Sequence, residues 1–254
     1  MMFEVGNTVT RKSYNDDVIF IILEIKEDIA YLKGTDIRLY ADAPLSDLNQ
    51  CDRKDDYTPS ISFDLCDRDE YFYLPGKILH IDGDEDYLNK SLEFYKKAGV
   101  LAIGRKIKES EMPGVVEQYL KEINPDILVI TGHDAFYDRM GNTNNINNYK
   151  NSKYFARCVQ IARNFEKSHE KLVIIAGACQ SDYEDIIKSG ANFASSPKRV
   201  NIHALDPAVI AVNIAMTDKR RSIDIKELLN KTKYGKNGIG GLEGNGMMYV
   251  GYPR

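Results

Sequence analysis

Almost wholly apolar runs alternate with amphipathic helical patterns from residue 76 onward, and this alternation constrains the fold more than any other feature. The clearest runs are DILVIT at Asp126–Thr131 and LVIIA at Leu172–Ala176. Strands without polar alternation are typical of a parallel sheet that helices cover on both faces. We therefore expect an α/β domain over residues 76–254, with a parallel-rich sheet flanked by helices.

The other elements of this domain follow the same alternation. Further strands are expected at Lys77–Ile81, Val100–Ile107 and Ala191–Ser195. Helices are expected at Tyr87–Ala98, Pro113–Ile123, Tyr154–Lys167, Asp182–Ser189 and Pro207–Met216. The asparagine-rich stretch MGNTNNINNYKNS between the third strand and the third helix is too polar to pack, so we expect a loop there.

Residues 1–50 have a different pattern, in which short β-rich runs are separated by polar turns. Strands are expected at Thr8–Arg11, Val18–Ile25, Ile29–Leu32 and Ile37–Ala41. Closely spaced strands of this kind favour a small SH3-like β-barrel. The polar residues 51–75 are predicted to form a linker between this barrel and the domain at 76–254.

Charge and apolar content exclude several kinds of partner. The formal net charge is -4, with acidic and basic residues mixed along the chain, so no nucleic-acid partner is expected. The apolar runs are too short to cross a bilayer and no signal peptide is evident, so we expect neither a membrane partner nor export. The cysteines lack metal-ligand spacing, so we expect reduced thiols in the cytoplasm, no metal and no cofactor. They are Cys51, Cys66, Cys158 and Cys179.

A histidine and a cysteine stand just beyond the two most apolar strands. DILVIT leads into Gly132-His133-Asp134, and LVIIA leads into Gly177-Ala178-Cys179. Because parallel strands end at one edge of a sheet, His133 and Cys179 are expected at the same edge. A Cys179 thiolate can attack a carbonyl, while His133 serves as base and then as acid. The Cys179 N–H, near the start of the next helix, can hold an oxyanion.

Structural roles are the alternative for each residue taken alone. A buried cysteine at a strand end more often packs as a small hydrophobe than it reacts. His80 and His203 are alternative bases, but His80 lies inside a strand and is expected to be packed. His203 lies in a loop close to the same edge and is a possible pocket residue. The placement of His133 and Cys179 beyond neighbouring strands favours catalysis.

The order of apolar strand, histidine, apolar strand and Ala-Cys resembles the caspase-like cysteine peptidases, including clostripain, gingipain, legumain and separase. The separation of His133 and Cys179 is close to the roughly 50 residues typical of caspases. Those families place a glycine after the histidine, whereas here Gly132 precedes it and Asp134 follows. The resemblance implies an oxyanion hole formed by the backbone N–H groups of Asp134 and Cys179.

Longer segments narrow the resemblance. GHDAFYD, YKNSKYFARCVQIAR, LVIIAGACQSDYEDIIKSGANFASSPKRVNIHALDP and VTRKSYNDDVIFIILEI are similar to the YabG family of sporulation-specific proteases from endospore-forming bacteria. The similarity extends over nearly the whole chain. It implies a cysteine endopeptidase that processes spore-coat and cortex-related protein precursors in the mother cell, associates with the spore coat and cleaves after arginine.

An arginine-selective pocket needs a carboxylate that can receive a guanidinium group. In the caspase-like fold, the end of the first sheet strand and the loop before the last helix often line this pocket, which suggests Asp82, Asp84 and Asp206. Ser195 and Ser196 are expected to pair with the substrate backbone. The alternatives are that the acids of DGDED favour a helix N-terminus and that Asp206 caps a helix. A calcium site in DGDED lacks the EF-hand spacing.

Two other functions stay open. A Cys-His amidase or transferase is one, although such enzymes usually place the histidine downstream of the cysteine. A non-catalytic scaffold of the spore coat is the other, and it predicts that Cys179→Ala leaves every processing event intact. The first 50 residues can be a docking or autoinhibitory module or a stabilising appendage, since small barrels serve many purposes.

Overall fold

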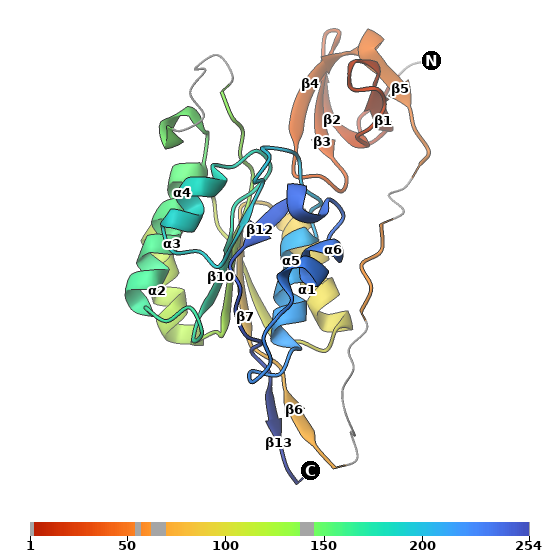
Figure 1. Ribbon diagram of the computed structural model, residues 1–254. Coiled ribbons are helices and arrows are strands. Elements are labelled where there is room, and N and C mark those ends of the chain that lie inside the picture. Colours follow the sequence, from red (N-terminus) through yellow and green to blue (C-terminus); the bar gives the residue numbers. More distant parts are fainter. Residues whose placement is uncertain (1–2, 54–56, 62–69, 138–144, 254) are drawn as a thin grey trace. The chain divides into compact units, whose positions relative to one another are not determined.

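The computed structural model describes residues 3–53, 57–61, 70–137 and 145–253 (Figure 1). The chain divides into two compact units, Met1–Thr58 and Pro59–Arg254. No helix in these described ranges is long and apolar enough to span a bilayer.

The first unit is a five-stranded antiparallel sheet with the order β4-β3-β2-β1-β5. Its strands are β1 (Thr8–Arg11), β2 (Phe20–Lys26), β3 (Ile29–Gly34), β4 (Tyr40–Pro44) and β5 (Leu48–Gln50). Alternate residues such as Val9, Phe20 and Leu32 are buried, and this period of two fixes which face packs. The fourth strand begins later than expected, and the polar β5 was not predicted. The SH3-like barrel stays a prediction.

The second unit contains a six-stranded sheet with the order β12-β11-β10-β9-β7-β8. Its strands are β7 (Ile78–Asp82), β8 (Ala102–Lys106), β9 (Ile127–Thr131), β10 (Val173–Ala176), β11 (Phe193–Ser195) and β12 (Ile239–Gly241). Neighbouring strands run parallel except β11 and β12. The prediction of a parallel-rich sheet is confirmed.

Helices cover both faces of this sheet (Figure 1). One face carries α1 (Glu85–Lys97), α5 (Asp206–Ala215) and α6 (Ile225–Asn230), and the other carries α2 (Met112–Ile123), α3 (Ser152–Phe165) and α4 (Tyr183–Lys188). Successive strand residues point to opposite faces, so Val129 packs in the first core and Ile130 in the second. Flanking helices were expected, whereas α6 and β12 were not.

Two short strands form a separate antiparallel ribbon. They are β6 (Phe72–Leu74) and β13 (Tyr249–Gly251), paired from Tyr249 with Leu74 to Gly251 with Phe72. β6 therefore lies within the stretch 51–75 that was expected to be a linker.

The asparagine-rich stretch is only partly described, since residues 138–144 lie outside the described ranges. Its described end is packed, which corrects the expectation that this stretch is too polar to pack. Asn148 closes a short 3-10 turn, and both it and Tyr149 are buried. The Tyr149 hydroxyl accepts a hydrogen bond from Arg199 Nε at 2.7 Å, which satisfies the polar end of the buried ring.

Candidate active site

The strand order places a topological switch point between β7 and β9. In the order β8-β7-β9-β10-β11, the chain proceeds from β7 to one side and then, from β9 on, to the other. Sheets of this doubly wound kind bind ligands beyond the carboxyl ends of the strands where the order reverses. Asp82 and Thr131 are register partners at those ends. The topology therefore points to this edge as the functional one.

His133 and Cys179 reach this edge in equivalent positions. Ile130 and Ala176 are register partners on β9 and β10, and His133 and Cys179 follow them by the same number of residues. Two further contacts join the loops beyond these strands. The Ser181 hydroxyl donates to Asp134 Oδ2 at 2.9 Å, and the Phe136 N–H donates to Gln180 Oε1 at 3.4 Å. The structure thus places both loops side by side.

The sulfur of Cys179 lies against the backbone of Ile202. The Ile202 N–H donates to Sγ at 3.3 Å, and Sγ lies 3.7 Å from the Ile202 carbonyl oxygen. These two contacts enclose the sulfur against one peptide group, with an N–H directed at it and an oxygen to which an S–H can donate. The cysteine is fully buried. Cys158 is fully buried as well, in the core of α3, and burial raises the pKa of its thiol to about 12, so that thiol is inert at neutral pH.

His133 is held through both its ring and its backbone. Nε2 lies 3.0 Å from Asp84 Oδ2, and the ring stacks at a tilt on Tyr87 with 5.8 Å between centroids. Its N–H donates to Glu109 Oε1 at 2.8 Å, and its carbonyl accepts from Asn151 Nδ2 at 2.7 Å. The imidazole is therefore held at its ring and at its backbone by groups of the chain itself.

Glu109 was not among the residues singled out from the sequence. It lies in the loop between β8 and α2, and its carboxylate occupies space that Gly83 and Gly132 leave open. A Cβ atom on Gly83 would lie 2.2 Å from Glu109 Oε1, and one on Gly132 would lie 2.5 Å from the same atom. The only sequence signal for this contact is a glycine directly after each of the two strands β7 and β9.

Asp82 and Asp84 belong to one buried hydrogen-bond network. Asp82 accepts from the Asp84 N–H at 2.9 Å and from the Thr131 hydroxyl at 2.8 Å. Asp84 is the N-cap of α1, because its Oδ1 accepts from the N–H of Asp86 at 3.0 Å. The helix N-terminus considered for DGDED is therefore present. Whether either acid also binds substrate stays a prediction.

His80 is packed, as expected. Its Nδ1 lies 2.9 Å from the Tyr95 hydroxyl and its Nε2 lies 2.7 Å from Thr131 Oγ1. The side chain is fully buried and continues the Asp82 network toward α1. In the described part of the chain, no three His, Cys, Asp or Glu side chains are grouped so that they could hold a metal ion.

Asp134 turns its side chain into the protein. Its carboxylate accepts hydrogen bonds from the hydroxyls of Ser152 and Ser181 and from the N–H of Asn151 at 2.7 Å. Burial raises the pKa of Asp134 above its ordinary value, although these hydrogen bonds act in the opposite direction. Among the described residues, its N–H has no hydrogen-bond acceptor. Ser152 and Ser181 were not among the site residues predicted from the sequence.

Ser195 and Ser196 are both fully buried at the end of β11. Within the described ranges, Ser195 Oγ has no hydrogen-bond partner. The Ser196 hydroxyl donates to the Val200 carbonyl and accepts from the Gln180 N–H at 2.9 Å. Ser196 therefore fastens the segment after β11 to the loop that carries Cys179.

Asp206 is fully buried and is the first residue of α5, where Leu205 is the N-cap. Its carboxylate accepts from the N–H of His203 at 3.2 Å and from the N–H of Lys233 at 2.9 Å. His203 is also buried, and its Nδ1 accepts from the Leu205 N–H at 3.1 Å. These contacts give Asp206 and His203 structural roles in the 203–206 turn, and a role of either in substrate binding stays a prediction.

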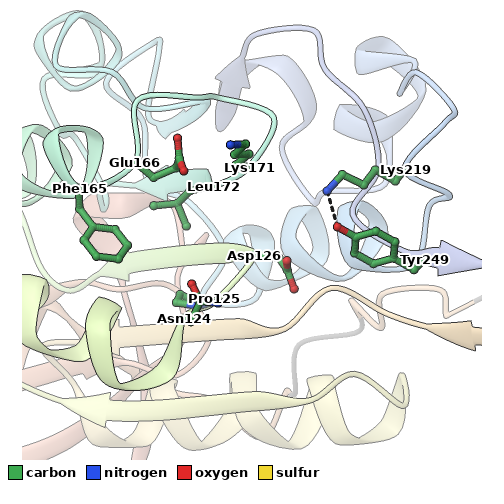
Figure 2. Close-up of a pocket in the computed structure, with 9 residues that line it drawn as sticks. All are labelled: Asn124, Pro125, Asp126, Phe165, Glu166, Lys171, Leu172, Lys219 and Tyr249. Atoms are coloured by element: carbon green, nitrogen blue, oxygen red, sulfur yellow. Dashed lines mark hydrogen bonds between the residues drawn. The ribbon is translucent and has the colours of Figure 1, made fainter.

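A pocket of ≈ 280 Å³ lies at the opposite edge of the sheet (Figure 2). Asp126 and Leu172, which line it, directly precede β9 and β10, so the pocket is at the amino ends of these strands. Lys219 Nζ donates to the Tyr249 hydroxyl at 2.7 Å on its rim. None of the predicted site residues lines it.

An α/β sheet with a histidine, a cysteine and acids gathered at its switch-point edge is typical of α/β enzymes. The sequence profile described as YabG peptidase U57 matches residues 4–65 and 60–253. The chain belongs to this family and is a peptidase. It is similar to the sporulation-specific protease YabG of Bacillus subtilis (strain 168), with 41% identity over 287 aligned residues covering 100% of this chain and 99% of that protein. The expected family is confirmed.

Proposed function

We propose that this peptidase is a caspase-like cysteine endopeptidase in which Cys179 is the nucleophile and His133 the acid–base. The observation that carries the proposal is the equivalent placement of the two residues beyond Ile130 and Ala176, which are partners on adjacent parallel strands. A nucleophile and a base must come within hydrogen-bond reach in the substrate complex. The 2.9 Å bond from Ser181 to Asp134 supports this, because it holds the two loops together.

In the proposed reaction, the Cys179 thiolate attacks the scissile carbonyl carbon. The backbone N–H groups of Asp134 and Cys179 hold the developing oxyanion. The unsatisfied N–H of Asp134 within the described residues supports its role. His133 then protonates the leaving amine, the C–N bond breaks, and an acyl-enzyme forms. Water, deprotonated by His133, attacks the acyl-enzyme and releases the acid product and the thiolate.

Substrate entry requires a local rearrangement. Cys179 is fully buried, and its sulfur contacts the backbone of Ile202. The peptide therefore displaces the segment around Ile202 when it reaches the sulfur. The orphaned hydroxyl of Ser195 supports a role in binding the substrate backbone, because a buried hydroxyl without a partner gains a hydrogen bond when substrate arrives.

Cleavage after arginine requires an acidic pocket, for which Asp82, Asp84 and Asp206 are the proposed candidates. Each is buried, so each can interact with a guanidinium group away from bulk water. Single alanine variants test them with matched arginine and neutral peptides. Only the pocket residue should lose preference for arginine, by about 2–5 kcal/mol, the effect of leaving a buried charge unpaired. If none of the three changes the preference, all three assignments are wrong.

The proposed substrates are spore-coat and cortex-related protein precursors, processed in the mother cell in association with the spore coat. The name of the Bacillus subtilis relative supports a role in sporulation. A peptidase implies protein substrates, and identification of those substrates requires comparison of coat extracts from cells with and without the active chain.

The deciding experiment incubates purified wild type, Cys179→Ala and His133→Ala with an arginine-containing peptide library. Cys158→Ala is the matched control, because this second buried thiol lies in the core of α3. We expect cleavage by the wild type and the control, and none by the other two variants. Equal cleavage by all four proteins would show that Cys179 and His133 are not catalytic, whereas absence of cleavage by all four would support a non-catalytic coat scaffold. Release of ammonia from side-chain amides, without cleavage of the chain, would support an amidase.

A further inference from the structure

We propose that Asp84 and Glu109 form a two-carboxylate clamp that positions His133, with Asp84 acting on the ring and Glu109 on the backbone. Both are positioning residues of the peptidase, and the proposal rests on the role of His133 given above. Both contacts are made between groups of the chain itself.

Asp84 determines which nitrogen of His133 exchanges protons. A carboxylate only accepts hydrogen bonds, so the 3.0 Å contact between Nε2 and Asp84 Oδ2 requires a proton on Nε2. The other nitrogen, Nδ1, is then the atom that takes the proton from Cys179 and returns it to the leaving amine. The buried carboxylate also stabilises the imidazolium ion that forms in this exchange.

Asp84 is itself fixed from two directions. Its Oδ1 accepts from the first-turn N–H groups of α1, at 3.0 Å from Asp86 and 3.4 Å from Tyr87. Its own N–H donates to Asp82 Oδ1 at 2.9 Å. One carboxylate thus joins the start of α1 to the imidazole, so the ring orientation is set by the fold.

Glu109 sets the backbone beneath the ring. Its Oε1 accepts the His133 N–H at 2.8 Å, and its side chain is largely buried. Gly83 and Gly132 make room for it, because a Cβ at either position would come within 2.5 Å of Oε1. The glycines after β7 and β9 therefore leave open the space that this carboxylate occupies between the two strand ends.

In the described part of the chain, charged and titratable groups face His133 from α1, from the loop after β8 and from the end of β7. Asp84 and the Tyr87 ring belong to the α1 side, and Glu109 belongs to the loop after β8. Asp82 lies one hydrogen bond behind Asp84. Asp84 and Glu109 are the members of this set that hydrogen-bond to His133, one at the ring and one at the backbone.

Variants at Asp84 separate its role as the N-cap of α1 from its contact with the imidazole and from its negative charge. Asp84→Ser keeps a good N-cap but is too short to reach the imidazole, and Asp84→Asn keeps both the cap and an acceptor while it removes the charge. Glu109→Gln keeps an acceptor for the His133 N–H, and Gly132→Ala displaces the Glu109 carboxylate. Glu85→Gln, an exposed acid in the same first turn of α1, is the matched control.

We expect Asp84→Ser to lower kcat by about 10- to 100-fold for arginine and neutral peptides alike, as for a misplaced catalytic group. Asp84→Asn should recover part of that loss. Gly132→Ala should lower kcat more than Glu109→Gln, and Glu85→Gln should match the wild type. An unchanged kcat in Asp84→Ser, or a loss confined to arginine peptides, would overturn the clamp and leave a pocket role for Asp84.

A second measurement does not depend on peptidase activity. Long-range ¹H–¹⁵N spectra report the protonated nitrogen of each imidazole, and His133→Gln assigns the signal among the four histidines. We expect the Nε2–H form for His133 in the wild type and Glu85→Gln, and loss of that preference in Asp84→Ser. An Nδ1–H form in the wild type would overturn the proposal. If the tautomers follow the expectation while no variant cleaves peptides, the clamp stands and the proposed reaction is wrong.

Discussion

The Ser181 hydroxyl donates a 2.9 Å hydrogen bond to Asp134 Oδ2, and this bond ties the loop after β10 to the loop after β9. The same hydroxyl oxygen accepts the Ala178 N–H at 2.9 Å. Both side chains are buried, so water cannot replace either contact. The relative position of His133 and Cys179 depends on this tie.

Ser181→Ala should therefore reduce both stability and activity. The change removes a donor from a buried carboxylate and leaves the buried Ala178 N–H without its acceptor, which costs about 1–3 kcal/mol for each unsatisfied group. Denaturant unfolding and kcat measured on one preparation test this. The exposed Ser60→Ala should stay within about 0.5 kcal/mol of the wild type. Wild-type values for Ser181→Ala would show that the tie is unimportant.

Asp134→Asn should change how stability depends on pH. Folding raises the pKa of Asp134 above its ordinary 3.8, because burial disfavours the charged form. The folded state then binds more protons than the unfolded state, so the free energy of unfolding falls as pH rises from 3.8 through the folded-state value. The variant should lack this fall. Melting over a pH series tests it, with the exposed Glu243→Gln as control. A variant that keeps the wild-type slope would contradict the assignment.

Gly177→Ala should destabilise the strand end that leads to Cys179. Gly177 has φ +108°, and a Cβ there would lie 3.2 Å from Ser195 Cβ. We expect a loss of about 1–3 kcal/mol, typical of a strained backbone, together with lower activity. Gly114→Ala in α2 meets no atom within 4 Å, so it should stabilise the protein by up to about 1 kcal/mol. Similar effects of the two changes would refute the strain at Gly177.

Ser195→Ala and Ser196→Ala should differ in their effects on stability and on KM. Ser195 Oγ has no partner among the described residues, so its removal should leave stability unchanged or raise it by up to about 1 kcal/mol. If Ser195 binds substrate, KM should rise while the fold is intact. Ser196→Ala removes one of the two acceptors of the Gln180 N–H, which also donates to the Val200 carbonyl at 3.3 Å, together with the hydroxyl's own hydrogen bond to that carbonyl. It should therefore destabilise the protein by about 0.5–1.5 kcal/mol. A destabilised Ser195→Ala with unchanged KM would rule out the binding role.

The fold of the second unit was predictable where burial leaves a strong local signal. Ile127–Thr131 and Val173–Ala176 are buried at every position, and such runs are apolar throughout. By contrast, β12 and β13 contain glycine and only three residues each. They form because the edge of another strand is available for pairing, and no local sequence pattern predicts such pairing.

The candidate site was predictable at the strand ends and not beyond them. His133 and Cys179 follow strands that the sequence makes evident, and Asp84 stands where a helix begins. The contact of Asp84 with His133 joins residues 49 positions apart, and that of Glu109 joins residues 24 apart. Glu109, Ser152 and Ser181 lie in segments without distinctive composition. Their roles come from tertiary contacts, which single-sequence patterns do not encode.

Covalent labelling tests the nucleophile most directly. A peptidyl-arginine chloromethyl ketone is incubated with the wild type, Cys179→Ser and Cys158→Ala, and the modified residue is mapped by mass spectrometry alongside residual activity. One adduct on Cys179 should form as activity is lost, in the wild type and Cys158→Ala alike, while Cys158 stays unmodified because burial raises the pKa of its thiol to about 12. Inactivation with the adduct on another residue, or full activity in Cys179→Ser, would contradict the assignment of Cys179 as nucleophile.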